Sequence, residues 1–243
     1  MMVWFSSLLL LLGTSAGSLI AVIFKRVPMS VNLNLSFAGG VMLVASFTSL
    51  IIPGIQKGGF AQTSLGILMG FALIGIIEHL FPHQHVIKGA EGAIKSQKLK
   101  KLYLIVAGVA IHNIPEGFGV GVSSAYSLET GTATAIAIAI QDIPEGLIVT
   151  LALMVANDKI IVPIVAGVLS GIVESLFCIL GFYTFDTFRN FLALGLGIGG
   201  GAMIYITVKE VFPEVYSEGS HTVSTLGFLA GFLLMLFLDT ALV

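Results

Sequence analysis

Hydrophobic residues in this chain form eight apolar runs of about 20 residues, separated by polar residues or by proline and glycine. About 20 apolar residues in an α-helix are long enough to cross the hydrocarbon core of a bilayer. The pattern therefore predicts an all-α integral membrane protein with eight transmembrane helices in one transmembrane domain, residues 1–243. The predicted spans are residues 3–24, 32–54, 60–81, 102–124, 131–155, 160–183, 190–212 and 222–242.

The composition agrees with a membrane protein. Hydrophobic residues make up 56% of the chain and charged residues only 10%, and the mean hydropathy is +1.04. The net charge of −2 gives no broad basic surface, so the chain is not expected to bind nucleic acid.

Basic residues are distributed unevenly between the two sets of loops that eight spans create. One set carries only Lys57 and Arg189. Cytoplasmic loops carry an excess of lysine and arginine, so the richer set is predicted to be cytoplasmic. Both termini then face outward, and the long loop at residues 82–101 is cytoplasmic. The richer set holds Lys25, Arg26, Lys88, Lys95, Lys98, Lys100, Lys101, Lys159 and Lys209.

Two similar polar segments lie in the middle of the fourth and fifth predicted spans. In the first, His112 and Glu116 share one helix face, with Asn113 on its flank, because a helix turns about 100° per residue. Acids in a bilayer need compensation, by protonation or by a bound cation. Imidazole, amide and carboxylate groups together favour a divalent transition metal. The second segment repeats the pattern with Gln141, Asp142 and Glu145.

Each polar segment also contains a proline, Pro115 or Pro144. A proline cannot donate to the carbonyl four residues earlier, so each helix is expected to bend and to free the oxygens of Ile111 and Ile140. An alternative interpretation is that the polar side chains only hold two helices together by hydrogen bonds. That role does not require three acids, so we favour a cation site.

Together the segments His-Asn-x-Pro-Glu-Gly and Gln-Asp-x-Pro-Glu-Gly resemble the paired signature of the ZIP (Zrt/Irt-like) metal transporters, prokaryotic branch. The resemblance implies that Met42, in a Gly-x-Met sequence, completes the metal site as a soft ligand. It also implies that Glu174, in a Ser-Gly-x-x-Glu sequence, joins the second of two adjacent metal positions. Finally, it implies an inverted repeat of spans one to three and six to eight around spans four and five, with which the glycine runs at 39–40 and 199–201 agree.

Six further residues are candidates for the path of the cation. Ser49 lies two turns beyond Met42, and Asp239 matches an acid that the family places near the outer end of its last span. Glu210 stands where the family commonly has a His-Glu pair, but the histidine is replaced by Lys209, a poor metal ligand while protonated. An interfacial polar stretch is the plainer account of the remaining three, the histidines His79, His83 and His85.

These features favour a transporter that carries divalent transition metal ions into the cytoplasm by alternating access. Zinc is the first candidate, with iron, manganese, cadmium and cobalt as others, because nitrogen and oxygen ligands discriminate weakly among them. The metal is then the transported substrate, no cofactor is predicted, and the protein is not expected to be an enzyme. The predicted location is the plasma (inner) membrane, and the resemblance implies a homodimer.

Two other functions stay open from the sequence. One is an intramembrane metalloenzyme, since a metal held by carboxylates can activate water. The other is a proton-coupled carrier of a small organic cation, with the acids as proton relays.

Overall fold

A computed structural model describes residues 2–24, 31–80, 84–85, 89–90, 98–156, 160–216 and 221–242. Over these residues the protein is helical, apart from one antiparallel pair of two-residue strands, β1 (Gln84–His85) and β2 (Gly89–Ala90). The helices are α1 (Met2–Phe24), α2 (Val31–Ala45), α3 (Ile52–Leu80), α4 (Lys98–Tyr126), α5 (Leu128–Ala156), α6 (Ile161–Thr187), α7 (Leu192–Ile206), α8 (Phe212–Val215) and α9 (His221–Leu242), with the short π-helices η1 (Ser46–Ile51) and η3 (Thr207–Val211) and the 3₁₀-helix η2 (Arg189–Phe191).

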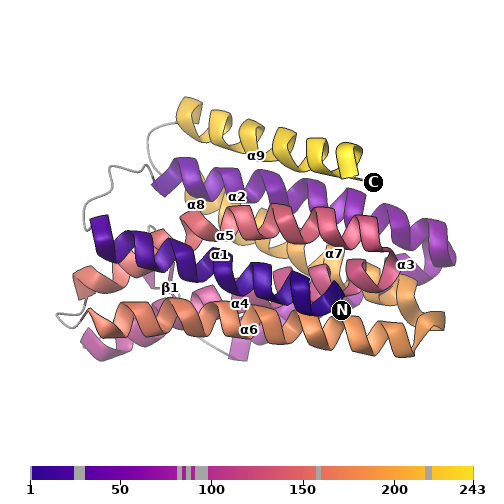
Figure 1. The fold of residues 1–243 in the computed structure, drawn as a ribbon, viewed down its shortest axis with the longest axis horizontal. Helices are drawn as coiled ribbons and strands as arrows, with labels where there is room; N and C mark the ends of the chain where they lie inside the picture. The colour runs from indigo at the N-terminus through magenta and orange to yellow at the C-terminus, as the bar shows by residue number, and fades with distance from the viewer. Residues whose placement is uncertain are drawn as a thin grey trace.

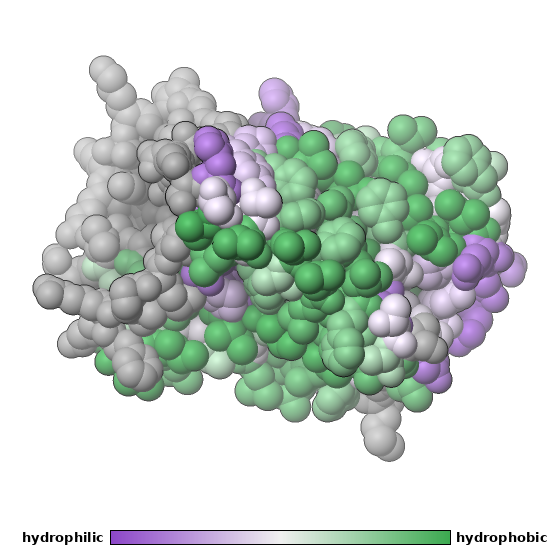
Figure 2. All heavy atoms as spheres, turned by 90° about the horizontal axis from the view of Figure 1, so that it is seen from above, coloured by the Kyte–Doolittle hydropathy of each residue, from purple (hydrophilic) through white to green (hydrophobic). Residues whose placement is uncertain are grey.

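The long helices lie side by side along the longest axis of the molecule, and both ends of the chain lie toward the same end (Figure 1). Figure 2 shows hydrophobic side chains over the middle of one face and hydrophilic side chains gathered at its right-hand end. This is the surface expected of a multi-pass membrane protein. Within the described residues, six segments are long and apolar enough to cross a membrane: Val3–Ile23, Asn32–Leu80, Leu128–Leu151, Ile161–Thr187, Arg189–Val215 and His221–Leu242.

The longest of these segments, Asn32–Leu80, has 49 residues and folds back on itself. As one straight helix it would be about 73 Å long, more than twice the roughly 30 Å of hydrocarbon. Gly59 interrupts it with a φ of 80°, a conformation that favours glycine. A Cβ placed on Gly54 would lie 2.9 Å from the side chain of Thr63, although these residues would be about 13 Å apart along a straight helix. The segment therefore consists of two arms that turn back at Gly59.

The helix bounds lie close to the predicted apolar ranges, with one clear difference. The helix α4 begins at Lys98, inside the stretch predicted as a loop at residues 82–101. Both α4 and α5 continue as α-helix through Pro115 and Pro144. The bends expected at these prolines therefore stay a prediction.

Two π-helical turns interrupt other helices, and the sequence analysis did not predict them. In η1 the hydroxyl of Ser46 donates to the carbonyl of Met42 at 2.6 Å, and in η3 the hydroxyl of Thr207 donates to the carbonyl of Met203 at 2.8 Å. A π-turn is rare and occurs frequently at functional sites. Both turns are followed directly by a further helical segment that contains a proline near its start.

The helices associate in two groups. In the first helix group, α4 packs against α6 and α5, and α1 packs against α5 and α6. In the second helix group, α3 packs against α7 and α2 against α9, η1 connects these pairs, and η3 and α8 extend α7. The two groups meet where α4 contacts α7 and where α5 contacts α2 and α9.

Glycine brings helix backbones together inside each group. A Cβ on Gly121 would lie 2.1 Å from the carbonyl oxygen of Cys178 in the first group, and one on Gly70 would lie 2.3 Å from that of Ile198 in the second. No larger residue fits at such crossings without a backbone shift. Where α4 meets α7, a Cβ on Gly119 would instead meet side-chain atoms, at 3.1 Å or more. A Cβ on Gly199 would lie 3.3 Å from the Cα of Gly119, so the backbones also approach each other at this contact, but less closely than inside the groups.

Replacing Gly70 by alanine is expected to lower the free energy of unfolding by about 1–3 kcal/mol, because the added Cβ overpacks the crossing with α7. Gly75→Ala on the same helix is the matched control, since its Cβ would meet only the Tyr205 ring and hydroxyl, at 3.4 Å or more. There alanine gains about 0.5–1 kcal/mol of helix stability. Thermal unfolding in detergent measures both, and equal unfolding temperatures would contradict the close crossing.

Candidate metal centre

Three carboxylates meet inside the first helix group. Glu116 on α4 and Asp142 and Glu145 on α5 each contribute one oxygen, and the three oxygens lie within 4.8 Å of one another. Glu116 and Asp142 are only 1% exposed. Zinc binds carboxylate oxygens at about 2.0–2.2 Å, so oxygens at this separation are able to share one ion.

Gln141 orients one of these acids. Its Nε2 donates to Oε1 of Glu116 at 2.5 Å, and its side chain is fully buried. Among the described residues, Oε2 of Glu116 and Oε1 of Gln141 have no hydrogen-bond partner. Both oxygens therefore keep lone pairs that a cation is able to use.

Glu174 on α6 adds a fourth carboxylate, which is fully buried and lies next to that of Asp142. Its Oε2 accepts hydrogen bonds from Nδ2 of Asn113 at 3.5 Å and from Oγ1 of Thr14 at 3.4 Å. Its Oε1 and both carboxylate oxygens of Asp142 have no partner within the described part of the chain. This side of the cluster therefore also presents several unused acceptors.

The concentration of acceptors has an energetic consequence. One ionised acid at the centre of a bilayer costs about 2.5–3.5 kcal/mol or more, and neighbouring acids repel each other. Carboxylate oxygens cannot donate to one another, so protons or cations must lie between them. Carboxylate, amide and imidazole groups together form a ligand set suited to a divalent transition metal.

His112 connects this cluster to the second helix group. Its Nε2 lies 2.5 Å from Oε2 of Glu210, a residue of η3 that is almost fully buried. Glu145 in the first group and Glu214 in α8 are also close enough to interact with the imidazole electrostatically. His112 thus stands where the carboxylate cluster meets the other group of helices.

The structure brings two further predicted residues together and places a third beside the helix of the cluster. Ser49 on η1 donates its hydroxyl to Oδ1 of Asp239 on α9 at 3.3 Å. Met42 is 2% exposed on α2, a helix that packs against α5. Met42 therefore lies on one of the two helices of the second group that contact the carboxylate-bearing α5.

The structure describes the predicted histidine group only in part. His79 is exposed in the last turn of α3. His83 lies outside the described residues, and His85 is described only by its backbone in β1. The role predicted for these histidines stays a prediction.

Sequence reasoning missed Thr14 as a partner of Glu174. The available signal was weak, because Thr14 is one of several small polar residues in an otherwise apolar first span. It also missed that Lys209 and Tyr205 both bind the carboxylate of Glu78. Residues so far apart in the sequence carry no local sign that they meet.

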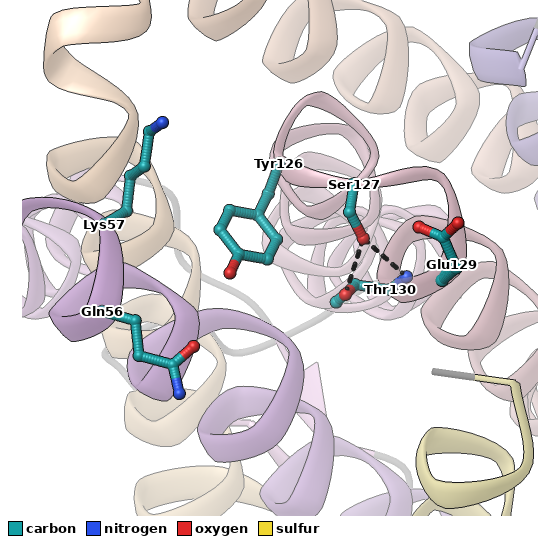
Figure 3. Close-up of a pocket in the computed structure, with 6 residues that line it drawn as sticks. All are labelled: Gln56, Lys57, Tyr126, Ser127, Glu129 and Thr130. Carbon is teal, nitrogen blue, oxygen red and sulfur yellow. Dashed lines mark hydrogen bonds between the residues drawn. The ribbon is translucent and has the colours of Figure 1, made fainter.

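An open pocket of about 480 Å³ lies away from these acids, where the turn of α3 faces the turn between α4 and α5 (Figure 3). In it the hydroxyl of Ser127 accepts the N–H of Thr130 at 3.0 Å, which caps α5. None of the predicted metal ligands lines this pocket. Its lining residues are Gln56, Lys57, Tyr126, Ser127, Glu129 and Thr130.

Comparison with known proteins assigns the chain to a family. The family model described as ZIP Zinc transporter matches residues 82–239, which include the four clustered carboxylates. The chain is 36% identical to zinc transporter ZIPB of Bordetella bronchiseptica, over 95% of this chain and 78% of that protein. It is 34% identical to zinc transporter ZupT of Corynebacterium glutamicum, over 92% of both, and 33% identical to zinc transporter GufA of Myxococcus xanthus, over 80% of both. The chain therefore belongs to the ZIP zinc transporter family.

Proposed function

We propose that this protein carries divalent transition metal ions, zinc above all, across the cell membrane into the cytoplasm. The observation that carries the proposal is the cluster of Glu116, Asp142 and Glu145, with the buried Glu174 beside it. Oxygens of Glu116, Asp142 and Glu174 have no hydrogen-bond partner among the described residues. The names of three relatives state that they transport zinc. Iron, manganese, cadmium and cobalt remain candidate substrates, because the ligand set discriminates weakly among them.

The ligands divide into two adjacent positions. The first takes His112, Glu116, Gln141 and Glu145, with Met42 from the second helix group. The second takes Asn113, Asp142 and Glu174, and shares the carboxylates of the first. The hydrogen bond from Gln141 to Glu116 supports the first position, and the bond from Asn113 to Glu174 supports the second.

Alternating access follows from motion of one helix group against the other. The closest glycine crossings, such as those of Gly70 and Gly121, lie inside the groups, while the looser approach of Gly199 to Gly119 and the bond between His112 and Glu210 lie at their contact. A rigid-body movement of one group against the other disrupts only the looser packing at their contact and leaves the packing inside each group intact. Seven of the eight ligands then travel with the first group, and Met42 stays with the second.

Eight transmembrane spans with both termini outside fit this arrangement. The two arms of Asn32–Leu80 contribute two spans, and α4, with 29 residues, adds one to the other candidate helices. Both ends of the chain lie at one end of the helices, as an even number of spans requires (Figure 1). The excess of lysine and arginine in one set of loops makes that side cytoplasmic, including residues 82–101.

An inverted repeat accounts for the packing of the helices. In this repeat α1 corresponds to α6, α2 to α7, α3 to α9 and α4 to α5. Contacts between helices follow the same correspondence: α3 packs against α7 as α9 packs against α2, and α4 packs against α6 as α5 packs against α1. The π-turns agree, because Met203 follows Met42 by the same number of positions as Thr207 follows Ser46. Glu210 follows Ser49 by that number as well. The matching register of two rare structural features supports descent from one repeated unit.

The metal is the transported substrate of a transporter family, and the members of that family are not enzymes. This membership disfavours the metalloenzyme, and it equally disfavours a carrier of organic cations. The family also supports a location in the plasma (inner) membrane. A homodimer within the lipid bilayer is part of the proposal.

Glu116→Ala and Glu145→Ala are each expected to reduce zinc flux into protein-loaded vesicles by at least about tenfold. Even residues that only support a metal ligand cost about 10–100-fold in metal affinity when lost. Glu129→Ala, an exposed acid on α5, is the matched control and should retain flux. Wild-type flux in both cluster variants would show that the cluster is not the transport site.

Thr14→Val keeps the shape of the side chain but removes a hydroxyl whose proton is shared between Oε2 of Glu174, at 3.4 Å, and the carbonyl oxygen of Leu10 in its own helix, at 3.2 Å. One such hydrogen bond contributes about 0.5–1.5 kcal/mol, so zinc affinity should fall about 2- to 10-fold. Thr132→Val is the control, because its hydroxyl bonds only to the carbonyl of Leu128 in its own helix. Calorimetric titration with zinc measures the affinity, and unfolding of the metal-free protein should change equally little in both variants. If the two variants bind zinc equally well, Thr14 does not position Glu174.

A further inference from the structure

A second polar cluster lies in the second helix group, on the side of Glu210 away from the central carboxylates. Its centre is Glu78, near the end of α3, whose carboxylate lies beside that of Glu210. The hydroxyl of Tyr205 donates to Oε2 of Glu78 at 2.7 Å, and the ammonium of Lys209 donates to the same oxygen. The cluster is therefore the next group of acids that a cation meets after His112.

Glu78 is buried and only half satisfied. Its side chain is 7% exposed, and its Oε1 has no hydrogen-bond partner within the described part of the chain. The neighbouring carboxylate of Glu210 cannot donate to it unless a proton lies between them. Two adjacent buried acids require positive charge: His112 lies at Glu210, and Lys209 supplies the charge at Glu78.

Lys209 differs from an ordinary buried ion-pair partner because its side chain is 52% exposed. Its Nζ bonds to Glu78 and, at 2.7 Å, to the hydroxyl of Tyr205, and it lies 4.9 Å from the centre of the tyrosine ring. A lysine carries a mobile point charge on a flexible stem. Lys209 therefore has room to leave the carboxylates without disturbing the helices.

The repeat described above provides an internal comparison. The counterpart of Glu78 is Asp239, and the counterpart of Glu210 is Ser49, so the opposite mouth has the Ser49–Asp239 hydrogen bond in the same place. That pair has one acid and one hydroxyl, and the position corresponding to Lys209 holds Thr48, whose hydroxyl bonds to its own helix. The lysine is thus found only at the one of these two corresponding positions where two acids are adjacent.

We propose that Lys209 is a tethered cation that binds Glu78 and thereby keeps a metal ion out of the position between the Glu78 and Glu210 carboxylates. The inference rests on the proposed function, because it concerns the cytoplasmic end of the metal path. While the ammonium is in place, a divalent cation that leaves His112 finds no second binding position and passes on. With the ammonium removed, the two carboxylates form a divalent cation site.

The test uses a background in which the central cluster is disabled, Glu116→Gln with Glu145→Gln. In this background Lys209→Gln should bind about one additional cadmium ion per protein in equilibrium dialysis, compared with the background alone. Lys57→Gln, the same change on an exposed lysine outside both clusters, should add none. Lys209→Arg keeps a tethered cation and should also add none. Adding Glu78→Gln to the Lys209→Gln protein should remove the additional ion.

Each outcome decides the proposal. An unchanged cadmium count in Lys209→Gln overturns it, and so does an additional ion that persists after Glu78→Gln. If Lys209→Gln folds only when cadmium is present, as size-exclusion chromatography would show, the metal has replaced the ammonium and the proposal holds. If the variant fails to fold with or without cadmium, Lys209 is a structural ion-pair partner and the proposal fails. Because Glu116 and Glu145 are replaced throughout and each cadmium count is compared with that background, these results are independent of zinc transport by the central cluster.

Discussion

Four carboxylates enclosed between apolar helices are the constraint on which this structure depends. Glu116, Asp142, Glu145 and Glu174 come from three helices, and several of their oxygens have no donor among the described residues. Such a cluster is stable only when protons or cations balance its charge. Helices that approach closely at glycine keep the acids near one another, so the requirement for a positive charge is built into the packing.

Close packing inside each helix group and a softer contact between the groups have different roles. Backbone-to-backbone crossings such as that of Gly121 with Cys178 hold the acid-bearing helices as one body. Across the contact, His112 reaches Glu210 on a π-turn rather than on a regular helix. This bond joins a proposed ligand in one group to an acid in the other, so it changes when the groups move relative to each other.

The proposed repeat is symmetric in its backbone and asymmetric in its chemistry. A Cβ on Gly117 would meet the backbone of Glu174, and one on Gly146 would meet that of Thr14, so these two residues occupy corresponding places. One is an acid and the other is the hydroxyl that hydrogen-bonds to it. The two mouths differ in the same way, with Ser49 at one and Glu210 at the other. Substitutions on a shared framework thus make the two ends of the molecule chemically different.

Sequence alone determined the helical membrane class, the approximate ends of the helices and the spacing of acids on α4 and α5, because helical periodicity and the cost of charge in lipid are local properties. The site residues themselves remain predictions that binding and flux must test. Only the tertiary structure decided which distant groups meet: Thr14 with Glu174, His112 with Glu210, and Lys209 with Glu78. It also decided the two π-turns, since one extra residue in a helical turn leaves no mark on an apolar pattern. Such contacts depend on how whole helices pack, which no single stretch of sequence encodes.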